Sequence, residues 1–241
     1  MWDIQLFKNN YDDLEVSAVA NVVENGWLTM GEHTKKFEDE FDKYLSDGIQ
    51  SLAVSSCTSA LYMSLLALGI KKGDEVVIPA ITFVADVNCV FMIGAKPVLA
   101  DSTSVDNWNV SASSIEKVIT DKTKAVIVVH YAGYPCDMES IRKLCDDKNL
   151  FLIEDVAHAP GASINGKMCG TWGDVSCFSF FSNKNISVGE GGMVVTSKPQ
   201  LLKKLHSLRS HGMNSLTLDR HKGRSISYDV IQPGLNFRLD E

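Results

Sequence analysis

The sequence has 241 residues, and its 23 Lys and Arg against 30 Asp and Glu give a formal net charge of −7. This balance argues against a nucleic-acid-binding protein, which needs a net or strongly clustered positive charge. Apolar residues make up 45% and charged residues 22%, an ordinary globular composition that argues against intrinsic disorder. The start carries no basic and apolar leader, and no apolar run approaches the roughly 18 residues of a membrane helix. We therefore expect a cytoplasmic protein without a membrane segment.

Two amphipathic stretches near the N-terminus, 14–24 and 34–45, predict helices. They flank the segment GWLTMGEH, and Gly26 and Gly31 mark this segment as a loop.

From about residue 51 onward, short apolar runs alternate with amphipathic stretches, which is typical of an α/β layered domain. Several runs are apolar on both faces, as expected for a sheet covered by helices on each side. The predicted strands are 51–55, 75–78, 97–100, 125–130, 150–154, 175–180 and 192–196, and the predicted helices between them are 59–68, 85–92, 111–119, 138–148 and 199–211. Ligands of such open sheets bind at the carboxyl ends of the strands, so the site is expected there.

The six cysteines are spread along the chain without a C-x-x-C pair. Buried reduced thiols are therefore favoured over a disulfide framework or a zinc site. No H-E-x-x-H motif occurs, and no metal site is expected.

The first candidate for chemistry is SSCTSALYM, where a strand ends and hydroxyl residues open a helix. Ser56, Thr58 and Ser59 could present hydroxyls and free N–H groups to a phosphate at the positive end of the helix dipole. The alternative is ordinary N-capping, which Ser and Thr perform at most helix starts.

The second candidate is LFLIEDVAHAPGA, in which a buried strand ends on Glu154 and Asp155. Side chains alternate along a strand, so one carboxylate can meet a ligand while the other faces the protein interior. A carboxylate beside a buried heterocycle would keep a ring nitrogen protonated. The alternative, favoured for such a residue taken alone, is a strand-end acid that caps the following helix or turn. His158 could act as a general base, although such a residue is more often a satisfied polar group lining a turn.

The third candidate is Lys184, between an aromatic strand and a Gly-rich turn, where a partly desolvated lysine could act as a nucleophile. A lone loop lysine is usually just solvated. Lys184, however, occurs together with a helix-start hydroxyl cluster and a strand-end Asp, and this combination favours a functional lysine over a merely solvated one. Pyridoxal phosphate needs an anion site, an acidic partner for its ring nitrogen and a Schiff-base lysine, and the sequence offers all three.

Two nucleotide-binding motifs are not matched by the sequence. GASINGKM approaches a Walker A pattern, but Met168 follows Lys167, so we interpret the segment as a hairpin turn. No G-x-G-x-x-G follows the first strand, which argues against a nicotinamide dehydrogenase.

Several blocks in order resemble the DegT/DnrJ/EryC1/StrS sugar aminotransferases, which are fold type I pyridoxal-phosphate enzymes. The blocks include GWLTMG, AVSSCTSAL, GDEVVIPAITFVA, HYAGYPCDM, IEDVAHAPGA, FSFFSNKNISVGEGGMVVT and LNFRLDE. The resemblance implies a three-layer large domain with a mostly parallel sheet of about seven strands. Residues 1–241 would form this cofactor-binding domain with an N-terminal helical segment, and the family's C-terminal small domain would be absent from the chain.

The resemblance assigns roles to particular positions. Lys184 resembles the Schiff-base lysine, Asp155 the partner of the ring nitrogen, His158 the residue beside the ring oxygen and Phe83 the aromatic stacked on the ring. The remaining expected contacts are Cys57, Thr58 and Ser179 to the phosphate, Asn236 to the phosphate of a neighbouring subunit, and Trp27 and Thr29 near a sugar nucleotide. Cys57 stands where relatives often have Gly, and a negative φ would make it tolerable there.

The resemblance implies an aminotransferase that moves an amino group, expected to come from glutamate, to a nucleotide-linked keto-sugar in polysaccharide or amino-sugar biosynthesis. It also implies a homodimer with shared sites. Lys184 argues against the family branch that carries histidine there and catalyses a dehydration. A non-catalytic regulatory or scaffold member and another fold type I reaction, such as dehydration or decarboxylation of an amino acid, stay open as alternatives.

Overall fold

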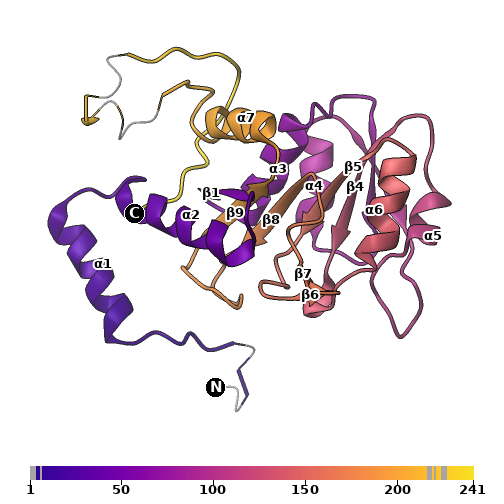
Figure 1. The fold of residues 1–241 in the computed structure, drawn as a ribbon, viewed down its shortest axis with the longest axis horizontal. Helices are drawn as coiled ribbons and strands as arrows, with labels where there is room; N and C mark the ends of the chain where they lie inside the picture. The colour runs from indigo at the N-terminus through magenta and orange to yellow at the C-terminus, as the bar shows by residue number, and fades with distance from the viewer. Residues whose placement is uncertain (1–3, 6, 216–218, 220, 224–226) are drawn as a thin grey trace.

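The computed structural model describes residues 4–5, 7–215, 219, 221–223 and 227–241 (Figure 1). Its centre is a seven-stranded sheet with the strand order β1-β9-β8-β5-β4-β2-β3. The strands are β1 (Gln50–Val54), β2 (Glu75–Pro79), β3 (Lys96–Ala100), β4 (Thr123–Val129), β5 (Phe151–Asp155), β8 (Val175–Ser179) and β9 (Gly192–Thr196). Neighbouring strands from β3 to β8 run parallel, whereas β9 is antiparallel to both β8 and β1. The expected mostly parallel sheet is confirmed.

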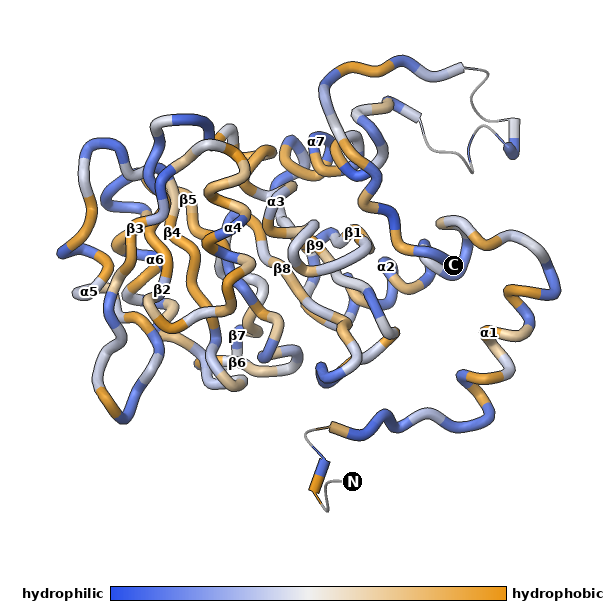
Figure 2. The backbone as a smooth tube through the Cα atoms, turned by 180° about the vertical axis from the view of Figure 1, so that it is seen from behind, coloured by the Kyte–Doolittle hydropathy of each residue, from blue (hydrophilic) through white to orange (hydrophobic). Residues whose placement is uncertain are grey.

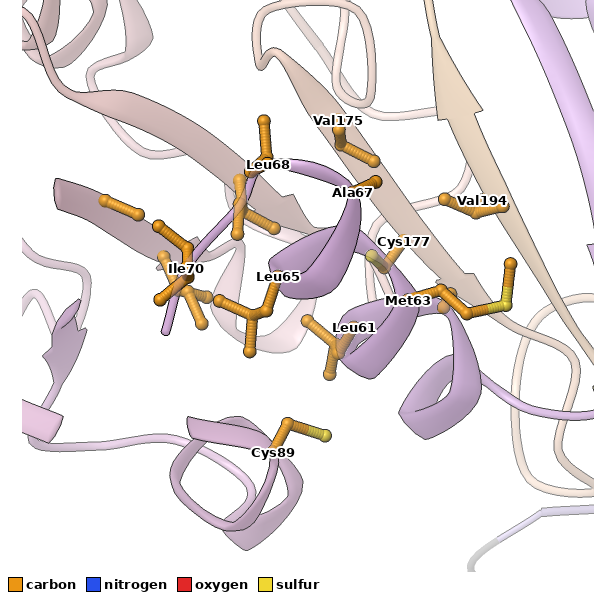
Figure 3. Packing of buried hydrophobic residues seen from close by; sticks show 14 of the residues in the cluster. Leu61, Met63, Leu65, Ala67, Leu68, Ile70, Cys89, Val175, Cys177 and Val194 are labelled. Atoms are coloured by element: carbon orange, nitrogen blue, oxygen red, sulfur yellow. The ribbon is translucent and has the colours of Figure 1, made fainter. Parts of the chain in front are cut away.

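Helices cover both faces of this sheet. The helices that the structure describes are α1 (Asp13–Asn25), which stands apart from the sheet, and α2 (Glu32–Leu45), α3 (Cys57–Ala67), α4 (Val84–Met92), α5 (Ala112–Glu116), α6 (Met138–Asp147) and α7 (Pro199–Arg209), with a short 3₁₀ turn η1 (Tyr131–Gly133). One face packs against α3, α4 and α7, and Figure 3 shows part of this core around α3. The other face packs against α2, α5 and α6. Alternating strand residues separate the two cores, since Ala125 and Ile127 belong to the first and Val126 and Val128 to the second.

Two predicted helices end earlier than expected. The helix predicted at 111–119 is limited to Ala112–Glu116, because β-branched Val118 and Ile119 are poor helix formers and close an i→i+3 turn instead. The helix predicted at 199–211 ends at Arg209, and His211 lies beyond it in the left-handed region with φ 58°. The other predicted elements lie within three residues of the observed bounds.

Two smaller expectations are also resolved. GASINGKM forms the antiparallel hairpin β6 (Ser163–Ile164) and β7 (Lys167–Met168), as interpreted. All six cysteines are free thiols, and all but the half-buried Cys57 are buried.

Helix α1 differs from the rest of the fold because none of its residues is buried. It stands apart from the layered body in both overall views (Figures 1 and 2). No described helix is long and apolar enough to cross a membrane.

Candidate active site

A cavity of about 570 Å³ opens at the carboxyl ends of β4, β5 and β8. This is the edge of an open α/β sheet at which ligands bind. Its walls are Ser56, Cys57, Thr58, Leu61, Thr82, Phe83, Ala85, Val129, Tyr131, Asp155, Ala157, His158, Ser179, Phe181, Asn183, Lys184, Glu190 and Gly191.

The start of α3 forms one side of the cavity. Ser56 is the N-cap and its hydroxyl accepts a hydrogen bond from the Ser59 N–H at 3.0 Å, so the capping interpretation holds for this pair. Cys57 and Thr58 occupy the first turn and line the cavity. The N–H groups of a first helical turn have no partner within the helix, so they are available to an anion. Cys57 is not among the positive-φ residues, which makes a side chain acceptable at this position.

Gly192 allows β9 to approach this helix start. A Cβ atom there would lie 2.5 Å from the carbonyl carbon of Ser56, 2.6 Å from the Cys57 nitrogen and 2.8 Å from the Phe178 oxygen. Only glycine can therefore bring β9 this close to α3. Gly192 therefore allows β9 to pack directly against the first turn of α3, which lines the cavity.

Asp155 ends β5 on the cavity side with only 5% of its surface exposed. Its Oδ1 accepts a hydrogen bond from the Ala157 N–H at 2.8 Å, and the Cys57 thiol lies 4.0 Å from the same oxygen. Oδ2 accepts no hydrogen bond from any residue that the structure describes. Burial raises the pKa of this carboxyl group, although the Ala157 N–H and the charge of Lys184 act against the shift. A buried carboxylate with an unused oxygen is suited to a cationic ligand group.

Glu154, one residue earlier, points to the opposite side and is fully buried. Its carboxylate accepts hydrogen bonds from the backbone N–H groups of Gly170, Trp172 and Gly173, from the Ser176 hydroxyl and from His130 Nε2. Burial opposes ionisation, but the bonds from His130 and from the loop N–H groups hold the pKa of Glu154 below its ordinary value. The two acids thus face opposite sides of β5, as the alternation of a strand predicts.

Lys184 lies in the turn after β8, where its N–H donates to the Phe181 carbonyl at 2.8 Å. Burial lowers the pKa of its amine, while the charges of Asp155 and Cys57 act in the opposite direction. Burial, followed by the charge of Lys184, also lowers the pKa of His158, which favours the neutral imidazole. A lysine with a lowered pKa has a larger share of the unprotonated, nucleophilic form.

The cavity brings together most of the residues singled out from the sequence: Cys57, Thr58, Phe83, Asp155, His158, Ser179 and Lys184. It does not include Asn236, which pairs in an isolated bridge with Ser210 and accepts the Arg238 N–H through its side chain. Trp27 lines a second, smaller cavity of about 270 Å³, and Thr29 lines neither cavity.

Sequence reasoning missed Tyr131 and Asp86. Tyr131 belongs to the block HYAGYPCDM, in which no single residue carries a chemical signature. Asp86 lies in the first turn of α4, is fully buried, and accepts a hydrogen bond from the Thr82 hydroxyl through Oδ2. Its Oδ1 is buried without a hydrogen-bond partner among the described residues. Burial, followed by the charge of Asp155, raises the pKa of Asp86 well above its ordinary value.

Comparison with solved structures places the protein in the class of the aminotransferases, as the sequence predicts. TlmJ of Streptoalloteichus hindustanus matches with a TM-score of 0.90 and 35% identity over 98% of this chain and 62% of its own. Spr1654 of Streptococcus pneumoniae, solved in PLP and PMP forms, matches with TM-scores of 0.88 and 0.89 at 26% and 27% identity, over 99% and 98% of this chain and 63% and 64% of its own.

The chain belongs to the DegT/DnrJ/EryC1/StrS aminotransferase family, whose model matches residues 9–241. It is 41% identical to GDP-perosamine synthase of Escherichia coli O157:H7 over 98% of this chain and 62% of that protein. It is also 40% identical to the uncharacterized protein MJ1066 of Methanocaldococcus jannaschii over 94% of this chain and 58% of that protein. The chain thus spans about three fifths of the length of these relatives. The family uses pyridoxal phosphate, and the first turn of α3 and the unused Asp155 oxygen fit its phosphate and its ring nitrogen.

Proposed function

We propose that the protein is a pyridoxal phosphate-dependent aminotransferase acting on a nucleotide-linked keto-sugar. The observation that carries this proposal is that Lys184, Asp155 and the first turn of α3 line one cavity. A non-catalytic scaffold would have no physical need to keep these three groups together. The match to GDP-perosamine synthase supports a nucleotide-linked sugar as the substrate class.

Each residue has a separate task in this proposal. The N–H groups of Cys57 and Thr58, with the Ser179 hydroxyl, would hold the phosphate, and Phe83 would cover one face of the ring. Asp155 would hold the ring nitrogen in its protonated form, since a nearby negative charge favours the cationic state. When bound, pyridoxal phosphate supplies an aldehyde that joins amines and a protonated ring that withdraws electrons.

Lys184 would hold the cofactor covalently at rest. Once an amino donor has displaced it, the free amine of Lys184 would remove a proton from the donor carbon and return one during the second half of the cycle. Its lowered pKa supports this role, because a base with a pKa nearer to the working pH is more often unprotonated. His158 would line the ring as a neutral imidazole.

The amino donor, the quaternary structure and the location belong to the same proposal. Glutamate is the expected donor, and the chain is expected to act in the cytoplasm as a homodimer. The position of Asn236 outside the cavity is compatible with its expected contact to the phosphate of a neighbouring subunit.

The test is the visible absorption spectrum of the purified chain with pyridoxal phosphate, compared with that of Lys184→Ala. We expect an absorption band of lysine-bound cofactor only with Lys184 present, and glutamate should remove this band. A band of equal strength in Lys184→Ala, or no band in either protein, contradicts the proposal. Incubation with sugar nucleotides and analysis of the products then separates sugar amination from reactions of amino acids alone.

A further inference from the structure

The turn that follows β4 aims two consecutive side chains in different directions. His130 is fully buried and its ring bonds to Glu154, whereas Tyr131 lines the cavity. The turn contains Ala132 with φ 52° and Gly133 with φ 87°, both in the left-handed region. A non-glycine residue in this region is a strained conformation, and such strain persists only where the surroundings enforce it.

The surroundings here hold Tyr131 rigidly. The buried side chain of Asn109 accepts the Tyr131 N–H at 3.1 Å and donates to the Tyr134 carbonyl at 2.9 Å, so it fixes both ends of the turn. The Cys136 N–H donates to His130 Nδ1 at 3.1 Å, which anchors the turn from inside. A Cβ atom at Gly133 would lie 3.1 Å from the His158 carbonyl, so the turn packs closely on the next segment of the site.

The ring of Tyr131 is held between two other aromatic rings. Its centroid lies 6.1 Å from that of His158 and 5.1 Å from that of Trp108, both in edge-to-face arrangements. Trp108 remains 47% exposed, and its indole N–H donates to the Val105 carbonyl at 2.9 Å. These rings form a short aromatic wall that runs from His158 in the cavity outward to Trp108.

The phenolic hydroxyl of Tyr131 makes no hydrogen bond with any of the residues described. A rigid polar group on a cavity wall with its bonding capacity unused is suited to a ligand, because little ordering entropy opposes the contact. A neutral hydroxyl donor is better matched to a ligand hydroxyl than to a ligand carboxylate, because a carboxylate binds more strongly to charged donors. The negative face of an aromatic ring suits the C–H groups of a sugar ring.

We propose that Tyr131 is a sugar-specificity residue of this cavity, donating a hydrogen bond from its hydroxyl to a hydroxyl of the sugar ring. This inference rests on the proposed function and extends it by naming the residue that recognises the sugar. Trp108 and His158 contact the Tyr131 ring, and the turn holds the backbone of this cavity-lining residue in place.

The test uses the chain with pyridoxal phosphate bound and measures binding of GDP-mannose and of GDP by titration calorimetry. Tyr131→Phe keeps the ring and removes only the hydroxyl. We expect it to weaken GDP-mannose binding about two- to ten-fold, the value of one neutral hydrogen bond, and to leave GDP binding unchanged. The matched control is Tyr134→Phe, because Tyr134 lies three residues along, is 75% exposed and is not among the cavity residues. It should change neither affinity.

Three results would overturn the inference: unchanged GDP-mannose binding in Tyr131→Phe, an equal loss for GDP, or a wild-type chain that does not distinguish GDP-mannose from GDP. The response to glutamate provides a further readout, since loss of the absorption band on adding glutamate should have the same concentration dependence in Tyr131→Phe and in the wild type. A weakened glutamate response with intact sugar binding would assign the hydroxyl to the amino donor and contradict the proposal. Failure of the proposed function is distinguishable, because it would remove the lysine-dependent band itself.

Discussion

The two sides of β5 carry adjacent acidic residues with opposite surroundings. Behind the strand, Glu154 accepts hydrogen bonds from three backbone N–H groups, a hydroxyl and a histidine. In front of it, Asp155 accepts one backbone hydrogen bond and leaves Oδ2 unused among the described residues. The pKa of Glu154 is lowered and that of Asp155 is raised, although both groups are buried. Unused hydrogen-bond capacity, rather than burial, therefore separates the acid expected to bind a ligand from the acid that organises the fold.

The largest change in stability is expected from substitution of Glu154, the acid behind β5. Glu154→Gln should lower the free energy of unfolding by about 3 kcal/mol, because the amide NH₂ replaces an acceptor among converging donors. For a chain of this length this corresponds to a fall in Tm of roughly 6–12 °C. Thermal and urea unfolding measure the change, with the exposed Glu40→Gln as the matched control. A loss of unfolding free energy no larger than that of Glu40→Gln would contradict the structural role of Glu154.

Asp155→Asn should affect cofactor binding strongly and stability only slightly. We expect a change in the free energy of unfolding of less than about 1 kcal/mol, since the ionised form of Asp155 is already disfavoured by burial. The affinity for pyridoxal phosphate should fall about 10- to 100-fold, because a charge-assisted hydrogen bond becomes a neutral one. Cofactor titration followed by absorbance measures this. Strong destabilisation with unchanged cofactor affinity would place Asp155 among the structural acids.

The smallest change in stability is expected for Asp86→Asn, and this change depends on pH. Its folded-state pKa is raised, so above about pH 4 the folded state holds more protons than the unfolded state and stability declines as pH rises through the folded pKa. Asp86→Asn removes this contribution. The difference in Tm between variant and wild type should therefore be more favourable to the variant at pH 8 than at pH 5. Thermal unfolding at the two pH values measures it, and a difference independent of pH would show that Asp86 does not titrate as described.

Local sequence signals were sufficient for the layered fold. Alternation and apolar runs place the seven strands of the sheet, and the Gly-rich spacing in GASINGKM predicts the β6–β7 hairpin. The exceptions occur where a helix end depends on more than periodicity, as at Val118 and His211. The alternation rule also predicts that Glu154 and Asp155 point to opposite sides, but it does not say which of them meets the ligand.

The groups in and around the cavity that sequence reasoning missed depend on contacts between distant segments. Gly192 is required because β9 approaches the start of α3, more than 130 positions earlier in the chain. Asp86 lies on a helix whose amphipathic pattern does not reveal that its carboxyl group feels the charge of Asp155. Tyr131 faces the cavity because Asn109 and Glu154 fix the turn around it. Such groups become recognisable only once the strand order is known.

In the proposed function, Lys184 carries the cofactor in the cavity in front of β5. Borohydride reduction of the chain with bound pyridoxal phosphate, followed by peptide mass spectrometry, tests it most directly because reduction makes the lysine bond permanent. We expect the phosphopyridoxyl mass on the peptide that contains Lys184, and its loss from that position in Asp155→Asn at limiting cofactor. Label on a different lysine, or label spread evenly over exposed lysines, would contradict it.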